Sequence, residues 1–173
     1  RLRPDGSPLL IERAEALAKK GQYRAALNIG LRRIKRLIAN KQRPQAVDAM
    51  VRVGAALRTG DAWAQKRAEQ LLVEAQRSKD PPAAAWLELG RLQRHRGYVT
   101  RAVSLFREAT RRDSTVAIAF WELGMTLKTR PPWRKPAIKA FRDFLHLQPQ
   151  GEDANRARAF LETLEHSQSP QKR

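Results

Sequence analysis

Cysteine is absent from this sequence of 173 residues. A disulfide framework, a thiolate metal site and a cysteine nucleophile are therefore all excluded. Long hydrophobic runs are absent as well: no stretch approaches the ~18–20 uninterrupted apolar residues that cross a bilayer, and no charged-then-apolar leader precedes a small-residue cleavage site. We expect a soluble protein, but its compartment stays open because the sequence begins with Arg1 and not with methionine.

Acidic residues are scarce relative to basic ones. The sequence has 17 aspartates and glutamates against 35 lysines and arginines, which gives a formal net charge of +18. An imbalance of this size favours anionic partners or surfaces and does not by itself indicate a fold. Arginine outnumbers lysine and alanine is abundant, a composition typical of a GC-rich bacterial genome.

Motifs that carry chemistry are also missing. The three histidines, His95, His146 and His166, lie far apart, and the sequence contains no HExxH pair and no glycine-rich phosphate-binding loop. The adjacent carboxylates Glu152 and Asp153 stand at the start of a predicted helix, where interaction with the helix dipole accounts for them. We therefore expect no catalytic residues, no metal and no cofactor, and a protein that is not an enzyme.

What the sequence does contain is a repeat. The tripeptide Glu-Leu-Gly at residues 88–90 recurs at residues 122–124, which is 34 residues later. In each copy apolar residues at helical intervals precede a breaker, Gly97 in the first copy and Pro131-Pro132 in the second, and another helical pattern follows. Each copy therefore predicts a helix–turn–helix hairpin.

Small residues recur where the two helices of a hairpin should meet. Two helices approach closely only where one side chain is nearly absent, so we expect Gly90 to pack against the partner helix through Ala102. Gly124 should pack in the same way against Ala137. The layers on either side would be filled by Leu89, Leu123, Phe106 and Phe141.

A period of 34 residues with the pattern W…LG…GY…A…F is typical of tetratricopeptide repeats, and this sequence resembles that family. The resemblance implies an all-α fold, a right-handed superhelical solenoid of about four tetratricopeptide-like hairpins followed by a C-terminal capping helix. The predicted boundaries are 8–40 for hairpin 1, 44–79 for a degenerate hairpin 2, 83–116 for hairpin 3, 117–151 for hairpin 4 and 152–166 for the capping helix, with flexible termini at 1–7 and 167–173. The third hairpin should begin with Asp80 as N-cap and Pro81 at the first helical position.

The family's stacked hairpins curl so that the first helix of each hairpin lines a concave groove. The predicted groove residues are Arg52, Arg58, Leu87, Arg91, Arg94, Trp121, Met125 and Lys128, accompanied by Asp48, Glu88 and Glu122. Arginine binds carboxylates with two parallel hydrogen bonds, and arginine with aromatic residues dominates binding hot spots. We therefore expect a non-catalytic adaptor or scaffold, such as an assembly factor, whose basic groove binds an acidic peptide or partner protein, with Trp121 as an apolar platform.

Two alternatives stay open at these positions. The arginines could form an ordinary solvated face, and Trp121 could pack against the neighbouring hairpin. A clamp of the kind that holds chaperone tails is not expected, because groove positions of this sequence hold Glu12, Glu15, Glu88 and Glu122.

A second concentration of positive charge lies outside the groove. Residues 16–47 include nine basic residues and no acidic one, and Arg32, Arg33 and Arg36 share one face of the outward-facing second helix. This basic convex patch suggests a function of another class, electrostatic binding of an anionic polymer or surface such as nucleic acid, anionic polysaccharide or lipid. The sequence leaves the oligomeric state and the identity of the partner open.

Overall fold

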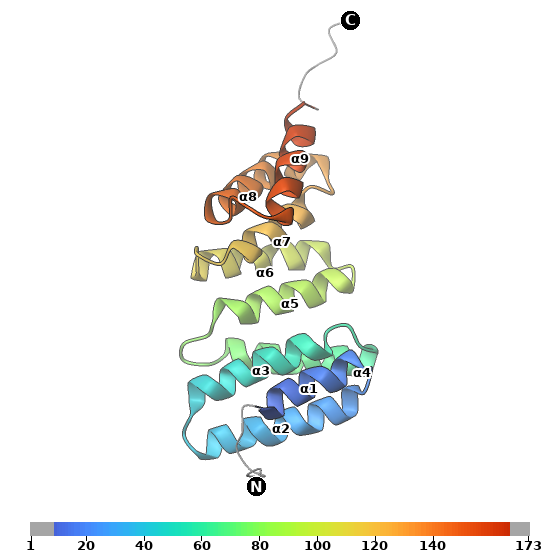
Figure 1. Ribbon diagram of the computed structural model, residues 1–173, viewed down its shortest axis with the longest axis vertical. Coiled ribbons are helices and arrows are strands. Elements are labelled where there is room, and N and C mark those ends of the chain that lie inside the picture. The colour runs from blue at the N-terminus through green and yellow to red at the C-terminus, as the bar shows by residue number, and fades with distance from the viewer. Residues whose placement is uncertain (1–8, 167–173) are drawn as a thin grey trace, which may run out of the picture.

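The computed structural model describes residues 9–166, and the termini predicted to be flexible, 1–7 and 167–173, lie outside this range. Within it the chain forms nine α-helices and one short 3-10 helix, with no strand. The elements are α1 (Leu9–Lys19), α2 (Tyr23–Ala39), α3 (Arg43–Leu57), α4 (Ala62–Gln76), α5 (Ala83–His95), α6 (Val99–Arg112), α7 (Ala117–Leu127), η1 (Pro131–Trp133), α8 (Arg134–Leu147) and α9 (Glu152–His166). Figure 1 shows them stacked along the long axis of the molecule, from α1 and α2 at one end to α9 at the other. The predicted all-α helical solenoid is confirmed.

Helices that follow one another in the sequence pack in pairs. α1 packs against α2, α3 against α4, α5 against α6 and α7 against α8, and the second helix of each of the first three pairs also contacts the first helix of the next pair. The first helices form a further row of contacts, from α1 to α3 to α5 to α7, while α9 packs against α8. This arrangement places α1, α3, α5 and α7 in one row, here named the inner helices. In the described part of the chain no helix is long and apolar enough to cross a membrane.

Glycine reverses the chain within two of the pairs. Gly21 and Gly97 have φ angles of 75° and 83°, in the left-handed region that residues with a side chain rarely adopt. After Gly97 the Tyr98 N–H donates a hydrogen bond of 2.9 Å to the Gln93 carbonyl, which closes the last turn of α5. The same bond follows Gly21 at the end of α1.

The starts of α4 and α5 are formed in different ways, and that of α5 differs from its prediction. Asp61 caps α4, because its carboxylate accepts a hydrogen bond of 2.8 Å from the N–H three residues further on. Before α5 the predicted N-cap, Asp80, is wrong: the helix begins at Ala83, and Pro82 occupies the N-cap with φ −70° and ψ 144°. A residue that precedes proline is disfavoured in the helical region, so Pro81 is a poor first helical residue when Pro82 follows it.

An apolar core runs the length of the stack. It consists of three overlapping groups of buried side chains, one from α1 to α5, one from α5 to α8 and one from α7 to α9. Among the fully buried side chains the largest are the rings of Phe106, Phe141 and Phe144. Each helix pair therefore buries its apolar face both within the pair and against its neighbours, as expected for a solenoid.

Gly90 and Gly124 mark close approaches of paired helices. A Cβ atom on Gly90 would lie 2.6 Å from the ring of Phe106, and one on Gly124 would lie 2.8 Å from the ring of Phe141. Both distances are far shorter than van der Waals contact, so only glycine fits without a shift of the ring. The close approach is as predicted, but the contacting group is the phenylalanine ring and not the alanine one turn earlier.

We expect Gly90→Ala to lower the free energy of unfolding by about 1–3 kcal/mol, because the new methyl group would overlap the ring of Phe106. At an ordinary helical position the same change stabilises by up to ~1 kcal/mol, so the sign of the effect is diagnostic. Urea denaturation of Gly90→Ala, Phe106→Leu and the double variant measures it, and the two costs should not add. A stabilised Gly90→Ala variant would contradict the close contact.

Candidate functional site

The inner helices carry all of the predicted groove residues, on the helices themselves or directly after them, and their arginines and glutamates face one another across helix boundaries. The first pairs join α3 to α1. Arg52 donates to both carboxylate oxygens of Glu15, at 2.8 Å and 2.9 Å, and to Glu12 at 3.2 Å. Two parallel bonds between a guanidinium and a carboxylate fix their orientation as well as their charge.

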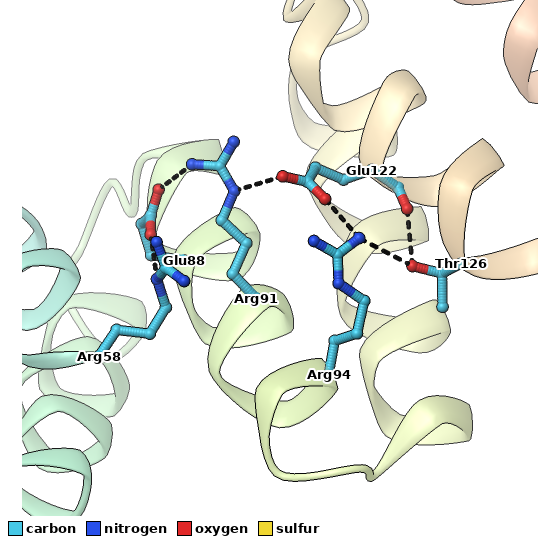
Figure 2. A network of polar contacts seen from close by, with 6 residues as sticks. All are labelled: Arg58, Glu88, Arg91, Arg94, Glu122 and Thr126. Atoms are coloured by element: carbon cyan, nitrogen blue, oxygen red, sulfur yellow. Dashed lines mark hydrogen bonds and ion pairs between the residues drawn. The ribbon is translucent and has the colours of Figure 1, made fainter. Parts of the chain in front are cut away.

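The next pairs join α3 to α5 and α5 to α7, and Figure 2 shows Arg91 between two glutamates. Glu88 accepts a bond of 2.6 Å from Arg91, and its other carboxylate oxygen lies 3.3 Å from Nε of Arg58 at the end of α3. Arg91 also donates to Glu122 of α7 at 2.7 Å. The second oxygen of Glu122 lies 2.6 Å from Arg94, so α5 is tied to α7 twice.

We name this set the arginine–glutamate ladder; it consists of Arg52, Arg58, Arg91, Arg94, Glu12, Glu15, Glu88 and Glu122. Glu88 and Glu122 are only 9% and 7% exposed, so the centre of the ladder is largely withdrawn from water. Burial by itself would lower the pKa of Arg91, but the charges of Glu88 and Glu122 outweigh burial and raise it above its ordinary value. Arg91 therefore stays protonated within the ladder.

The ladder removes the expected excess of positive charge from these groove positions. Its formal charges, four positive and four negative, cancel. The cause is the repeat itself: Glu88 and Glu122 occupy the same position of successive repeats, and stacking brings them to either side of Arg91. The repeat pattern predicted packing roles for the leucine and glycine of the Glu-Leu-Gly tripeptide. The structure adds a role for its glutamate, which pairs with arginines of the inner helices.

Trp121 belongs to the core and is not an open platform. It is 7% exposed, and its ring packs against Phe141 and Phe144 of α8 and Phe160 of α9, with centroid distances of 5.8, 5.3 and 6.2 Å. The prediction of an apolar platform in the groove is wrong at this position because α8 and α9 cover the ring. Leu87 is buried in the core as well.

The last two predicted groove residues lie next to α9. Met125 is half-buried against the aromatic group that contains Trp121. Lys128 places its ammonium group 3.7 Å from the ring centroid of Phe160, a cation–π contact. From α9, Arg156 stands 5.2 Å from the ring of Trp121. The C-terminal end of the inner row is thus covered by α9 and offers little open surface.

An open cleft, here named the inner cleft, lies between α1, α3 and α5 and has a volume of about 360 Å³. Its lining is mostly small and includes Ala18, Val51, Ala55, Ala56, Thr59 and Ala84. Polar groups come from Glu88 and from the Arg52–Glu15 pair, and Lys19 adds a positive charge at the end of α1. Arg52 and the accompanying Glu88 of the predicted groove line this cleft.

The predicted convex patch lies on α2. Arg32 and Arg36 are exposed, whereas Arg33 is half-buried. A backbone hydrogen bond lowers the pKa of Glu12 on α1, and the charges of Arg52 and Arg33 lower it further. Arg33 therefore acts on the carboxylate of Glu12 as well, and only Arg32 and Arg36 of the predicted three are exposed.

No sequence pattern predicts the polar cluster between α4, α5 and α6. Glu69 lies 2.7 Å from Arg96, accepts a bond of 3.0 Å from the fully buried Gln93, and lies 3.9 Å from Arg101. Burial alone would raise the pKa of Glu69, but the hydrogen bond and charge of Arg96 outweigh it and hold the pKa below its ordinary value. Between residues 9 and 166 no cluster of three or more histidine, aspartate or glutamate side chains could hold a metal ion.

The stacked pairs and the inner row give the chain the fold of tetratricopeptide repeat proteins. A tetratricopeptide repeat protein from Parabacteroides merdae matches with a TM-score of 0.68 at 16% sequence identity over 91% of this chain, which spans 59% of that protein's chain. The crystal structure of the MamA protein gives a TM-score of 0.61 at 16% identity, with 91% of this chain and 85% of that one covered. YrrB, described as a tetratricopeptide repeat protein with an unusual peptide-binding site, gives 0.55 at 18% identity, with 87% and 90% covered.

No protein-family model matches the sequence, and no curated protein matches it either. At these levels of identity the likeness to solved structures shows the fold alone.

We expect Glu122→Gln to lower the free energy of unfolding by about 1–3 kcal/mol, because it leaves the guanidinium groups of Arg91 and Arg94 without their shared buried carboxylate. Glu108→Gln is the matched control, since Glu108 also binds two arginines, at 2.6 Å and 2.9 Å, but within α6 and near the solvent. Chemical denaturation should give a much smaller change for it. Equal losses in the two variants would show that the ladder contributes no more than surface pairs do.

The lowered pKa of Glu69 predicts a loss of stability in acid. A carboxylate whose folded pKa lies below its unfolded value stabilises the fold fully above the unfolded value, about 4.3, and this contribution disappears as the pH falls through the folded pKa. The difference in unfolding free energy between wild type and Glu69→Gln should be largest near neutral pH and shrink below about pH 4.3. Glu74→Gln, an exposed position of the same helix, corrects for the loss of one charge; a pH-independent difference would contradict the assignment.

Proposed function

We propose that the chain is a non-catalytic scaffold that binds a segment of a partner protein in the inner cleft. The observation that carries the proposal is the cleft itself, an opening of about 360 Å³ bounded by three inner helices. Sites of this size that combine small apolar side chains with a few polar groups are typical of ligand binding. The inner polar residues join helices through ion pairs, which supports binding rather than catalysis.

The chemistry of the cleft fits an extended peptide. Ala18, Ala55 and Ala84 leave room for a backbone to approach the helices, and Arg52 and Glu88 can bond to its polar groups. Among proteins of similar fold, YrrB is described as having a peptide-binding site. We carry that role to this chain on the strength of the cleft.

We take the partner segment to be acidic, because Arg52 and Lys19 line the cleft and can bind its carboxylates. Glu12 is the outermost partner of Arg52, with 47% of its side chain exposed and the longest of the three bonds at 3.2 Å. A carboxylate of the partner can replace Glu12 there while Lys19 remains available at the rim. The net charge of +18 would also speed the encounter with an acidic protein.

The repeat units of this scaffold are proposed to follow the helix pairs. They would comprise 8–40, the degenerate 44–79, 83–116 and 117–151, with 152–166 as the capping helix. Support comes from the packing of each pair and from the cover that α9 gives to the last pair.

The alternative function is electrostatic binding of an anionic polymer or surface through the convex patch. Arg32 and Arg36 are exposed one helical turn apart, with the exposed Lys35 beside them. Nucleic acid, anionic polysaccharide or lipid would bind such a face without reading sequence, and its affinity would fall steeply with salt.

The test compares what the purified chain retains from a nuclease-treated lysate of its source at about 0.15 M salt. Ala84→Trp fills the inner cleft from an exposed position, and Ser104→Trp, exposed on α6, is the matched control. We expect a discrete protein that wild type and Ser104→Trp retain and Ala84→Trp loses.

Equal retention by both tryptophan variants would place the site outside the inner cleft. Retention that falls steeply with higher salt and disappears with Arg32→Glu and Arg36→Glu together would instead establish the convex patch.

A further inference from the structure

A second cleft, here named the outer cleft, lies between α6, α7 and α8 and has a volume of about 510 Å³. Its floor is apolar and consists of Phe120, Leu123 and Leu127 of α7 with Pro136 and Ala140 of α8. None of its lining residues lines the inner cleft. It is therefore a separate surface that the proposed function does not use.

Positive charge lines both walls of the outer cleft. Arg107 comes from α6, and Lys135 and Lys139 come from α8. Asp143 contributes negative charge to the lining and lies 2.8 Å from Lys139. The lysine side chain is 77% exposed despite this contact, so its ammonium group stays accessible. The lining thus carries more positive than negative charge around an apolar floor.

The floor and the wall repeat with helical spacing. Phe120, Leu123 and Leu127 are three and seven residues apart and follow α7 for about 10 Å at the rise of an α-helix. Lys135 and Lys139 are four residues apart, one turn of α8. A bound helix would place an apolar side chain against the half-buried Phe120 and acidic side chains one turn apart facing the lysines.

We propose that the outer cleft binds an acidic amphipathic helix of a partner protein. Leu127 and Ala140 are 0% and 2% exposed, so the accessible apolar surface of the cleft lies mainly on the half-buried Phe120 and Pro136. Nucleic acid would use the cations but not the apolar floor. A helix with a narrow apolar ridge and carboxylates beside it matches both the apolar surface and the cations of the cleft.

The experiment measures binding of a fluorescein-labelled synthetic peptide to the full chain by anisotropy at about 0.15 M salt. The peptide has roughly 14 residues of leucine, glutamate and alanine with the leucines on one helical face, and a scrambled peptide of the same composition is the control. We expect Lys135→Glu with Lys139→Glu to weaken binding at least tenfold, by loss of both wall charges and repulsion of the peptide. Lys66→Glu with Lys79→Glu, exposed positions outside both clefts, changes the net charge equally and should weaken binding less than threefold.

Four results would overturn the proposal. Equal binding of the scrambled peptide, or equal weakening by the Lys66 and Lys79 substitutions, would reduce the effect to general charge attraction. No saturable binding up to about 1 mM would exclude this ligand class. Self-association that disappears with Lys135→Glu and Lys139→Glu would make a second copy of the chain the occupant.

The test is separate from that of the proposed function. Ala84→Trp fills the inner cleft and should leave binding of the amphipathic peptide unchanged. Loss of peptide binding in Ala84→Trp would move the peptide to the inner cleft and remove the outer cleft as its site.

Discussion

Contact between a phenylalanine ring and a glycine backbone sets the spacing of the last two helix pairs. Because Gly90 has no side chain, the ring of Phe106 reaches the backbone of α5, and Phe141 does the same at Gly124 on α7. The pairs are then narrow enough for the inner helices to stack with Arg91 only 2.7 Å from Glu122. A larger residue at either glycine would widen the pair and separate these groups.

The ladder also determines where the positive charge of the chain can act. With the inner arginines held by glutamates, the excess of +18 falls mainly on other surfaces, including the exposed face of α2 and the walls of the outer cleft. Buried ion pairs cost desolvation energy that their attraction only partly offsets, so their contribution to stability is modest. We infer that they favour one register of stacking, because a shifted helix would leave a buried carboxylate without its guanidinium.

Local patterns predicted the fold well because each depends on neighbouring residues. The glycine before Tyr98 and the recurrence of Glu-Leu-Gly indicated the turn and the repeat, and both are present. The fate of Trp121 depends on α9, some thirty residues away, and helical spacing carries no information about which element covers a side chain. Likewise the sequence indicated which arginines lie on the inner helices. Their glutamate partners lie on other helices and can be identified only once the helices are stacked. The outer cleft needs three helices in place and has no sequence signal at all.

The position of the ladder on only one side of the stack has a mechanical consequence. Ion pairs join α1 to α3, α3 to α5 and α5 to α7 along the inner row, each between side chains that reach across one helix boundary. Straightening the solenoid would lengthen that row and pull each arginine from its glutamate, whereas tighter curling would leave the bonds intact. The ion pairs of the ladder therefore resist lengthening of the inner row. The stack of helix pairs is stiffer against straightening than against further bending.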